Sequence, residues 1–157
     1  MAAINIRWAA PDDWAQVKEL SKKLHSEAAW YNSHPFDEDH AHKEYLRRIN
    51  GGDRFSFVVE LEGQIVGILV GFFSTLHTCP LKIATEEIVY VLPEYRSMKI
   101  GFLLIREMEN WAEFNGADVA KVGNSTGITS SRTAERYKAM GYQPYSDVFL
   151  KELPNER

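Results

Sequence analysis

The sequence predicts an α/β (α+β) fold, with a mixed β-sheet of about six to seven strands flanked by about four helices. Three observations support this prediction. Runs rich in β-branched and aromatic residues alternate with stretches whose apolar residues recur at helical spacing. Short clusters of glycine, proline and asparagine separate these runs. The chain has 157 residues, which fits one domain over residues 1–157 that buries about two-thirds of its unfolded surface without metals or disulfides.

The N-terminal half is expected to contribute two helices and four strands. Trp14, Val17 and Leu20 follow one another at helical spacing. Glu62-Gly63 lies between two β-rich runs and is the strongest hairpin signal in the chain. In order, the expected elements are a strand over 4–8, a helix that begins at 11–13, a helix over 39–49, and strands over 54–61, 64–73 and 83–92.

The C-terminal half is expected to contribute two helices and three strands. Ile100, Leu104 and Met108 belong to an apolar stripe at helical spacing, and this stripe ends near Asn115-Gly116, a pair typical of helix ends. The expected elements are a helix over 100–115, a strand over 119–122, a helix from 130 or 131 to 140, and strands over 142–145 and 147–151.

Composition excludes several classes of function. No apolar run approaches the roughly 20 residues of a membrane span, and the N-terminus lacks the apolar core of a signal peptide. Cys79 is the single cysteine, so no intrachain disulfide forms, and a cytoplasmic location is expected. The formal charge of −4 argues against a nucleic-acid surface, which needs clustered Lys and Arg, and is compatible with a cationic or amine substrate.

The segment from 87 to 104 carries the most functional information. A β-branched strand ends at Pro93, a short basic turn with Arg96 and Lys99 follows, and an apolar helix then begins. Free backbone N–H groups at a helix N-terminus, next to two cations, suit a phosphate or pyrophosphate. The alternative is an ordinary strand-to-helix loop with a solvated basic pair. If Lys99 needs left-handed backbone geometry, that conformation costs about 1 kcal/mol or more.

Three motifs in this order resemble those of the GNAT superfamily of acyl-CoA-dependent N-acyltransferases. The stretch Arg96–Gly101 is similar to the family's pyrophosphate-binding motif, with Lys99 where the family usually has glycine. Glu87 aligns with the strand glutamate that serves as base in the histone-acetyltransferase branch. The stretch Tyr137–Tyr142 is similar to the late helix end whose tyrosine lies beside the coenzyme A sulfur. The C-terminal half is also similar in style to small acyltransferases of bacteria and tailed phages.

The resemblance implies an acetyltransferase in which a primary amine attacks acetyl-CoA directly in a ternary complex. It implies that Glu87 accepts the amine proton, Tyr137 protonates the thiolate, and the backbone N–H of Val91 binds the oxyanion. Ser130 stands where many members have asparagine. The residues expected to bind acetyl-CoA, the cosubstrate, are Val91, Leu92, Pro93, Arg96, Ser97, Met98, Lys99, Ile100, Gly101, Phe102 and Ser130.

The acceptor side is less specific. Trp30, Tyr31 and Phe36 lie between the first two expected helices, where the resemblance implies a wall of the acceptor pocket for a small-molecule or peptide amine. The alternative is a solvated helix start capped by Asp37 or Asp39. Four of the five histidines fall nearby, but their spacing does not fit zinc ligands and no metal is expected.

Two rival functions remain open. Lys99 and Ser130, which depart from the family pattern, favour a non-catalytic CoA-binding or protein-interaction module, whereas Glu87 together with Tyr137 opposes it. An acetyltransferase acting on a protein lysine or N-terminus is the other alternative. A homodimer is also left open.

Overall fold

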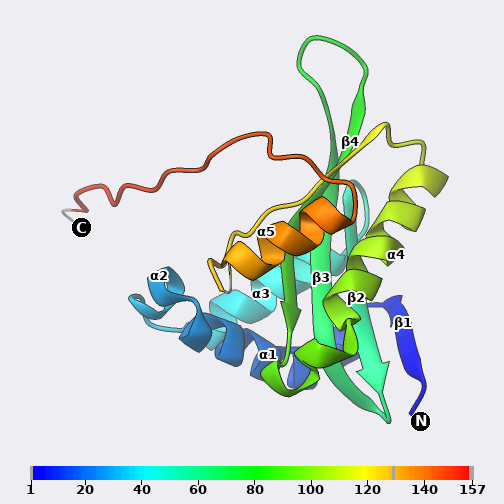
Figure 1. Ribbon diagram of the computed structural model, residues 1–157. Coiled ribbons are helices and arrows are strands. Elements are labelled where there is room, and N and C mark those ends of the chain that lie inside the picture. The colour runs from blue at the N-terminus through cyan, green and yellow to red at the C-terminus, as the bar shows by residue number, and fades with distance from the viewer. Residues whose placement is uncertain (1, 129, 156–157) are drawn as a thin grey trace.

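The computed structural model describes residues 2–128 and 130–155, and a single mixed sheet forms its centre (Figure 1). The strand order is β1-β2-β3-β4-β5; the first four strands are antiparallel, and β5 runs parallel to β4. This arrangement confirms the predicted fold class. The strands are β1 (Ile4–Trp8), β2 (Arg54–Leu61), β3 (Gln64–Thr75), β4 (Lys82–Val91) and β5 (Val119–Lys121).

Helices cover both faces of the sheet. The helices α1 and α3 pack against one face and α4 against the other, with α5 on the same side as α4 (Figure 1). No helix among the described residues has the length and apolar character needed to cross a membrane. The helices are α1 (Trp14–Glu27), α2 (Ala29–Asn32), α3 (Glu38–Ile49), α4 (Ile100–Phe114) and α5 (Ser130–Ala139), with short 3-10 turns η1 (Pro11–Asp13) and η2 (Pro93–Met98).

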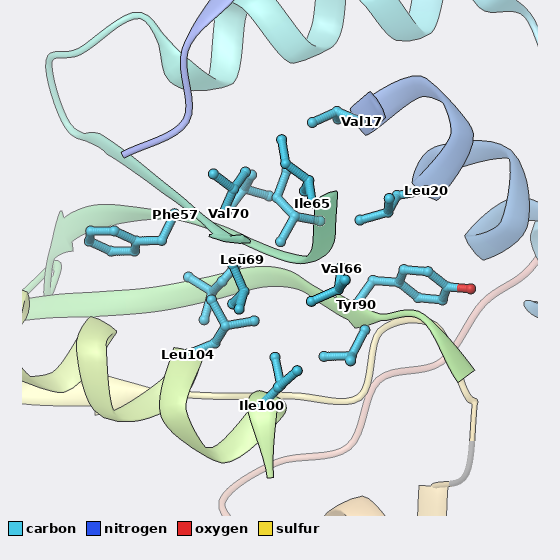
Figure 2. Packing of buried hydrophobic residues seen from close by; sticks show 14 of the residues in the cluster. Val17, Leu20, Phe57, Ile65, Val66, Leu69, Val70, Tyr90, Ile100 and Leu104 are labelled. Atoms are coloured by element: carbon cyan, nitrogen blue, oxygen red, sulfur yellow. The ribbon is translucent and has the colours of Figure 1, made fainter. Parts of the chain in front are cut away.

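The apolar core lies on both sides of the sheet (Figure 2). Val17 and Leu20 of α1 approach it from one side, while Ile100 and Leu104 of α4 approach it from the other. Burying one such side chain contributes roughly 1.5–3 kcal/mol. The helical spacing read from the sequence therefore identifies the residues that fix α1 and α4 to the sheet.

The predicted hairpin between β2 and β3 is confirmed. Glu62 and Gly63 both have positive φ angles, 50° and 80°. Two consecutive residues with φ > 0 make the two-residue turn whose twist matches that of the flanking strands. Gly63 accommodates this geometry without a Cβ penalty.

A bulge interrupts the pairing of β4 with β3 at the point where the site begins. Gly71 pairs with Glu86 and Val70 with Ile88, so Glu87 has no Cα partner. A Cβ atom on Gly71 would lie 2.4 Å from the Thr85 carbonyl oxygen, so only glycine allows this close approach. On the other edge, β4 pairs with β5 only over Ile83–Thr85. Thr85 pairs with Lys121, the last residue of β5, so beyond this point β4 has no partner from β5.

The two strands predicted over 142–145 and 147–151 are wrong, and the sheet has five strands in place of six to seven. The described residues 143–155 make no backbone–backbone hydrogen bond; they run outward from α5, away from the sheet, to the side where α2 lies (Figure 1). The segment over 142–151 has a β-rich composition, but a strand forms only where a neighbouring strand supplies hydrogen-bond partners. Among the described residues, no strand pairs with this segment.

Candidate active site

A cavity of about 430 Å³ opens where the pairing of β4 with β5 ends. Its walls come from the end of β4, the turn η2, the first turn of α4, the segment 123–128 and one face of α5. Residues of β4 beyond Thr85 have no strand partner on the β5 side, so their backbone can pair with an extended, amide-bearing ligand. The cavity is therefore a groove between the end of β4 and the segment that follows β5, with the N-terminus of α4 at one end.

The cavity is basic although the chain as a whole is acidic. Four cations line it, namely Arg96, Lys99, Arg132 and Arg136, against one carboxylate, Glu86. The formal charge of the chain is −4. Such a local excess of positive charge attracts an anionic ligand. Arg132 and Arg136 were not predicted as site residues, because the sequence pattern of a helix is the same whether its arginines face solvent or a cavity.

Lys99 adopts the left-handed conformation, with φ 59° and ψ 20°, immediately before α4 begins. This geometry explains why glycine is usual at this place in the family motif. A lysine here costs about 1 kcal/mol or more in backbone energy. Its ammonium adds a cation at a helix N-terminus that already offers free N–H groups, and the side chain lines the cavity.

Gly101 lies in the first turn of α4 and lines the same cavity. A Cβ added there would meet only the Val91 side chain, at 4.0 Å, which is ordinary contact. The protein itself therefore leaves room for alanine at this position. The absence of a side chain becomes useful only if a ligand approaches the backbone of the helix start closely.

Arg96 is already engaged within the protein. Its Nε donates to the Val91 carbonyl at 2.9 Å, and its Nη2 forms an ion pair with the Glu27 carboxylate at 2.9 Å. Tyr90 donates its hydroxyl to the same carboxylate. The contacts balance part of the Arg96 charge and fix the end of α1 to the end of β4. Arg96 lines the cavity, but the structure assigns it a bracing contact that the sequence did not indicate.

Glu86 and Tyr137 converge on the backbone of Gly123 from opposite walls of the cavity. Glu86 Oε2 accepts a hydrogen bond from the Gly123 N–H at 3.0 Å, and the Tyr137 hydroxyl donates to the Gly123 carbonyl at 2.9 Å. Both side chains line the cavity. One peptide segment thus positions a carboxyl and a phenol beside each other in the groove.

The environment of each group changes its acidity. Burial raises the pKa of Glu86 to about 7, an effect that the Gly123 N–H opposes and the nearby Glu87 carboxylate reinforces. Burial is also the main cause that raises the pKa of Tyr137, with a smaller contribution from Glu86. Near neutral pH the carboxyl can therefore accept a proton and the phenol retains one that it can donate.

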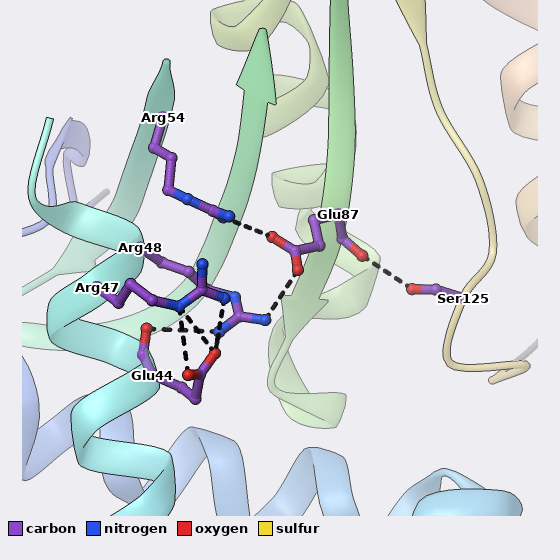
Figure 3. Close-up of polar contacts among 6 residues, drawn as sticks. All are labelled: Glu44, Arg47, Arg48, Arg54, Glu87 and Ser125. Carbon is purple, nitrogen blue, oxygen red and sulfur yellow. Dashed lines mark hydrogen bonds and ion pairs between the residues drawn. The ribbon is translucent and has the colours of Figure 1, made fainter. Parts of the chain in front are cut away.

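Glu87 points away from this cavity, toward α3 and β2 (Figure 3). Its carboxylate forms ion pairs with Arg48 at 2.8 Å and with Arg54 at 3.2 Å. Only its backbone touches the groove side, where the carbonyl accepts a hydrogen bond from Ser125 Oγ at 3.0 Å. The two neighbouring glutamates thus face opposite sides of the sheet, as expected for a strand, and it is Glu86 that enters the groove.

The structure separates the other predicted cofactor residues into groups. Val91, Arg96, Lys99, Gly101 and Phe102 line the cavity. The remaining ones do not: Leu92 and Ile100 are buried in the core, Pro93, Ser97 and Met98 lie on the turn η2, and Ser130 begins α5 with its side chain outside the described part of the structure.

The predicted acceptor residues lie on and after α2 and do not line the cavity. Trp30 packs edge-on against Tyr31, and Phe36 packs against His25. The segment directly follows Glu27, which is bound to Arg96 at the rim of the cavity. The side chain of Asp37 accepts a hydrogen bond from the backbone N–H of residue 40, so its role as the helix cap is confirmed.

The described residues contain no group of three or more His, Cys, Asp or Glu side chains arranged as a metal site would require. Cys79 is free and exposed in the loop between β3 and β4.

The fold and the groove define a class of protein, the acyl-CoA-dependent acyltransferases. A family model described as the acetyltransferase (GNAT) family matches residues 14–142. The chain therefore belongs to the GNAT family of acetyltransferases, and the resemblance read from the sequence is confirmed. No curated protein matches the sequence.

Solved structures with low sequence identity share the fold. An aminoglycoside N-acetyltransferase in complex with CoA is 14% identical, with a TM-score of 0.74 and coverage of 98% of this chain and 96% of that chain. An aminoglycoside antibiotic 6'-N-acetyltransferase from Acinetobacter baumannii is 19% identical, with a TM-score of 0.75 and coverage of 98% and 100%. A ribosomal-protein-alanine N-acetyltransferase from Brucella melitensis is 12% identical, with a TM-score of 0.76 and coverage of 96% and 99%.

Proposed function

We propose that this protein transfers an acetyl group from acetyl-CoA to a primary amine by direct attack, with Glu86 as the proton acceptor and Tyr137 as the proton donor. The observation that carries the proposal is the basic groove between β4 and β5 in which these two side chains meet at Gly123. Acetyl-CoA is an extended anion with amide groups, which fits a groove with free strand backbone and a helix N-terminus.

The phosphate end of acetyl-CoA is assigned to the start of α4. Lys99 and the N–H groups of the first helical turn supply the positive end, and Arg132 and Arg136 face the same cavity from α5. Arg96 holds the wall of the groove through Glu27 and Val91. The pantetheine arm would then follow β4 past Val91 toward Glu86.

The reaction removes two protons from the ammonium nitrogen and adds one to the leaving thiolate. A primary amine has a pKa near that of lysine, about 10.4, so it arrives protonated and must lose a proton before its nitrogen can attack. The Glu86 carboxylate takes that proton, directly or through water, because a base with a pKa near the working pH is the most effective. The new N–C bond forms as the C–S bond breaks, and the Tyr137 hydroxyl protonates the leaving thiolate. The nitrogen then loses its second proton to the Tyr137 oxygen and Glu86 releases its proton to solvent, so both side chains return to their starting states.

Glu87 was the base expected from the resemblance. Its carboxylate forms ion pairs with Arg48 and Arg54 outside the cavity, and acceptance of a proton by this carboxylate would break both ion pairs. We therefore assign Glu87 a structural role at the β4 bulge. The backbone N–H of Val91 stays a candidate donor to the oxyanion, since Val91 lines the cavity.

The acceptor is proposed to enter beside α2, where Trp30, Tyr31 and Phe36 supply aromatic surface for an amine. Trp30 is about half exposed, with a relative accessibility of 48%. The solved neighbours include enzymes named for aminoglycosides and one named a ribosomal-protein-alanine N-acetyltransferase, so small-molecule and protein acceptors both belong in the test.

Calorimetry with acetyl-CoA tests the donor half of the proposal. We expect one binding site and, at about 100 times the dissociation constant, stabilisation of the fold by roughly 2.7 kcal/mol. Arg106→Ala, which removes an exposed arginine of α4, is the matched control and should bind normally. Absence of binding would refute the proposed function.

A mass-spectrometric screen for acetylated products across amines and peptides tests the acceptor half. Acetylated small amines would support the proposal, acetylated peptides would indicate a protein substrate, and binding of acetyl-CoA without any product would indicate the non-catalytic alternative.

A further inference from the structure

Asn124 places a buried hydrogen-bond donor in the groove that the proton transfers do not use. Its side-chain nitrogen Nδ2 is buried and has no hydrogen-bond partner among the described residues. Three other side-chain atoms share this property, on Arg48, Ser56 and Trp111, but of the four residues only Asn124 lines the cavity. A buried N–H without an acceptor loses its hydrogen bonds to water and gains none in exchange, so a folded protein rarely keeps one without a reason.

The backbone fixes the position of Asn124. Gly123, directly before it, donates its N–H to the proton acceptor and accepts at its carbonyl from the proton donor of the proposed reaction. Directly after it, Ser125 Oγ donates to the Glu87 carbonyl at 3.0 Å. The Asn124 carbonyl itself accepts from the Gly127 N–H at 3.2 Å. The carboxamide is therefore held on a well-braced segment, as a preorganised donor requires.

Asn124 lies next to the place where the reacting atoms meet. Glu86 and Tyr137 converge on Gly123, and consecutive Cα atoms are only about 3.8 Å apart. In the proposed reaction Glu86 serves the amine nitrogen and Tyr137 serves the sulfur. The carbon bonded to both of these atoms carries the thioester carbonyl oxygen. As the N–C bond forms, the π electron pair of the carbonyl moves onto this oxygen, and it returns when the C–S bond breaks.

The chemistry of Nδ2 restricts what it can bind. An amide nitrogen offers N–H donors and no acceptor, and an ammonium group also offers only donors, so the protonated amine cannot satisfy Asn124 Nδ2. A carbonyl oxygen can. The β4 wall of the groove offers backbone N–H groups, and Asn124 stands on the other wall, in the segment that follows β5. Because a carbonyl oxygen has two lone pairs, one donor from each wall can bind it.

We propose that the Asn124 carboxamide donates a hydrogen bond from Nδ2 to the thioester carbonyl oxygen of the acyl donor and stabilises the oxyanion that forms there. This inference deepens the proposed function and rests on it. The carboxamide carries no charge, so its contribution is the same across the pH range in which Glu86 titrates. Asn124 was not expected from the sequence, because a polar residue in a loop gives no sign of being buried.

Calorimetry with acetyl-CoA and with CoA tests which oxygen is bound, because CoA has the pantetheine arm but lacks the thioester carbonyl. We expect Asn124→Ala to weaken acetyl-CoA binding by about threefold to tenfold, the effect of one neutral hydrogen bond, and to leave CoA binding unchanged. Asn110→Ala, at an exposed asparagine of α4 outside the cavity lining, is the matched control and should bind both as the parent does. Equal losses for both ligands would assign Nδ2 to the pantetheine arm, and no loss for either would leave it without a ligand; each result would overturn the proposal.

Thermal melts separate this role from a structural one. Since Asn124 Nδ2 has no partner in the protein, Asn124→Ala should melt no lower than the parent. A marked loss of stability would show that the carboxamide supports the fold, and would overturn the assignment.

Turnover with an amine from the product screen tests the oxyanion role. We expect Asn124→Ala to lose about 10²–10³-fold in turnover, the effect of removing one oxyanion donor, with the shape of the pH–rate profile unchanged. Asn124→Asp, which keeps the shape but replaces the N–H group by an oxygen, should lose at least as much. Turnover of Asn124→Ala within a few-fold of the parent, or tighter binding of the amine by Asn124→Asp, would overturn the proposal while the proposed function stands. A parent that does not bind acetyl-CoA would overturn both.

Discussion

Replacement of Glu86 by glutamine tests the central assignment through stability as well as activity. The carboxyl has a pKa of about 7 in the folded protein and an ordinary value of 4.5 when unfolded. Folding therefore favours its protonated form. Between pH 4.5 and 7 the folded state binds more protons than the unfolded state, so the free energy of unfolding falls as pH rises. The stabilisation is complete below about pH 4.5 and is lost as pH rises through about 7.

The magnitude follows from the same two values. The difference between 4.5 and about 7 corresponds to about 3 kcal/mol, most of which is lost between pH 5 and pH 8. Glu86→Gln keeps an oxygen that can accept from the Gly123 N–H but cannot ionise. We therefore expect the variant to gain about 2–3 kcal/mol relative to the parent between pH 5 and pH 8, or about 5–10 °C in melting temperature for a domain of this size.

The assay is urea unfolding of the parent and the variant at matched pH values from 5 to 8. Glu87→Gln is the neighbouring control: it removes ion pairs with Arg48 and Arg54 and should lower stability by about 1–3 kcal/mol. That loss should vary with pH much less than the Glu86→Gln difference does, because the Glu87 charge is the smallest of the causes that shift the pKa of Glu86. A parent–variant difference for Glu86→Gln that stays constant within about 0.5 kcal/mol over the range would refute the reasoning.

Four further outcomes are expected. In pH–rate profiles, Glu86→Gln should lower turnover by about 10²–10⁴-fold and remove the rise in turnover near pH 7. A Glu86→Gln enzyme within a few-fold of the parent would exclude Glu86 as the base. Tyr137→Phe should slow turnover in a way that depends on the thiol leaving group, measured with acyl donors of different thiol pKa, and equal losses with all donors would contradict its role. Gly101→Ala should stabilise the fold by about 0.5–1 kcal/mol yet weaken acetyl-CoA binding in calorimetry; unchanged affinity would mean that no ligand approaches the helix start. Lys99→Gly should relieve about 1 kcal/mol of backbone strain, seen in thermal melts, and weaken acetyl-CoA binding, and a loss of stability would show that the left-handed geometry carries no penalty.

Much of the fold follows from local sequence signals. Glu62-Gly63 specified the turn between β2 and β3, and the apolar stripe beginning at Ile100 specified α4 to within a residue. Such signals depend on chain geometry within a few residues, so one sequence is enough to read them. The predicted strands over 142–145 and 147–151 failed because a strand also needs a neighbour, and no local pattern reveals where the neighbour lies.

The site was predictable in outline only. The basic turn with Lys99 indicated where an anion would bind, and Tyr137 was expected beside the coenzyme A sulfur; the structure places both side chains in the lining of one cavity. Arg132 and Arg136 could not be recognised, because cations on a helix are usually solvated and only tertiary structure directs them to a cavity. The contact of Arg96 with Glu27 joins residues that lie 69 positions apart, and no motif records it.

The choice between two adjacent carboxylates shows where sequence reasoning stops. Alternation along a strand predicts that Glu86 and Glu87 face opposite sides, but it does not say which one faces the groove. A bulge at Glu87, beside the close approach of Gly71 to β4, interrupts the pairing of β3 with β4, which continues on both sides of it. The residue on the α3 side meets two guanidinium groups, while the residue on the α5 side meets one backbone N–H and an apolar wall. Burial in the second environment raises the pKa of Glu86 to about 7, so this carboxyl can exchange a proton near neutral pH, which is the property that the proposed acetyl transfer to an ammonium substrate requires.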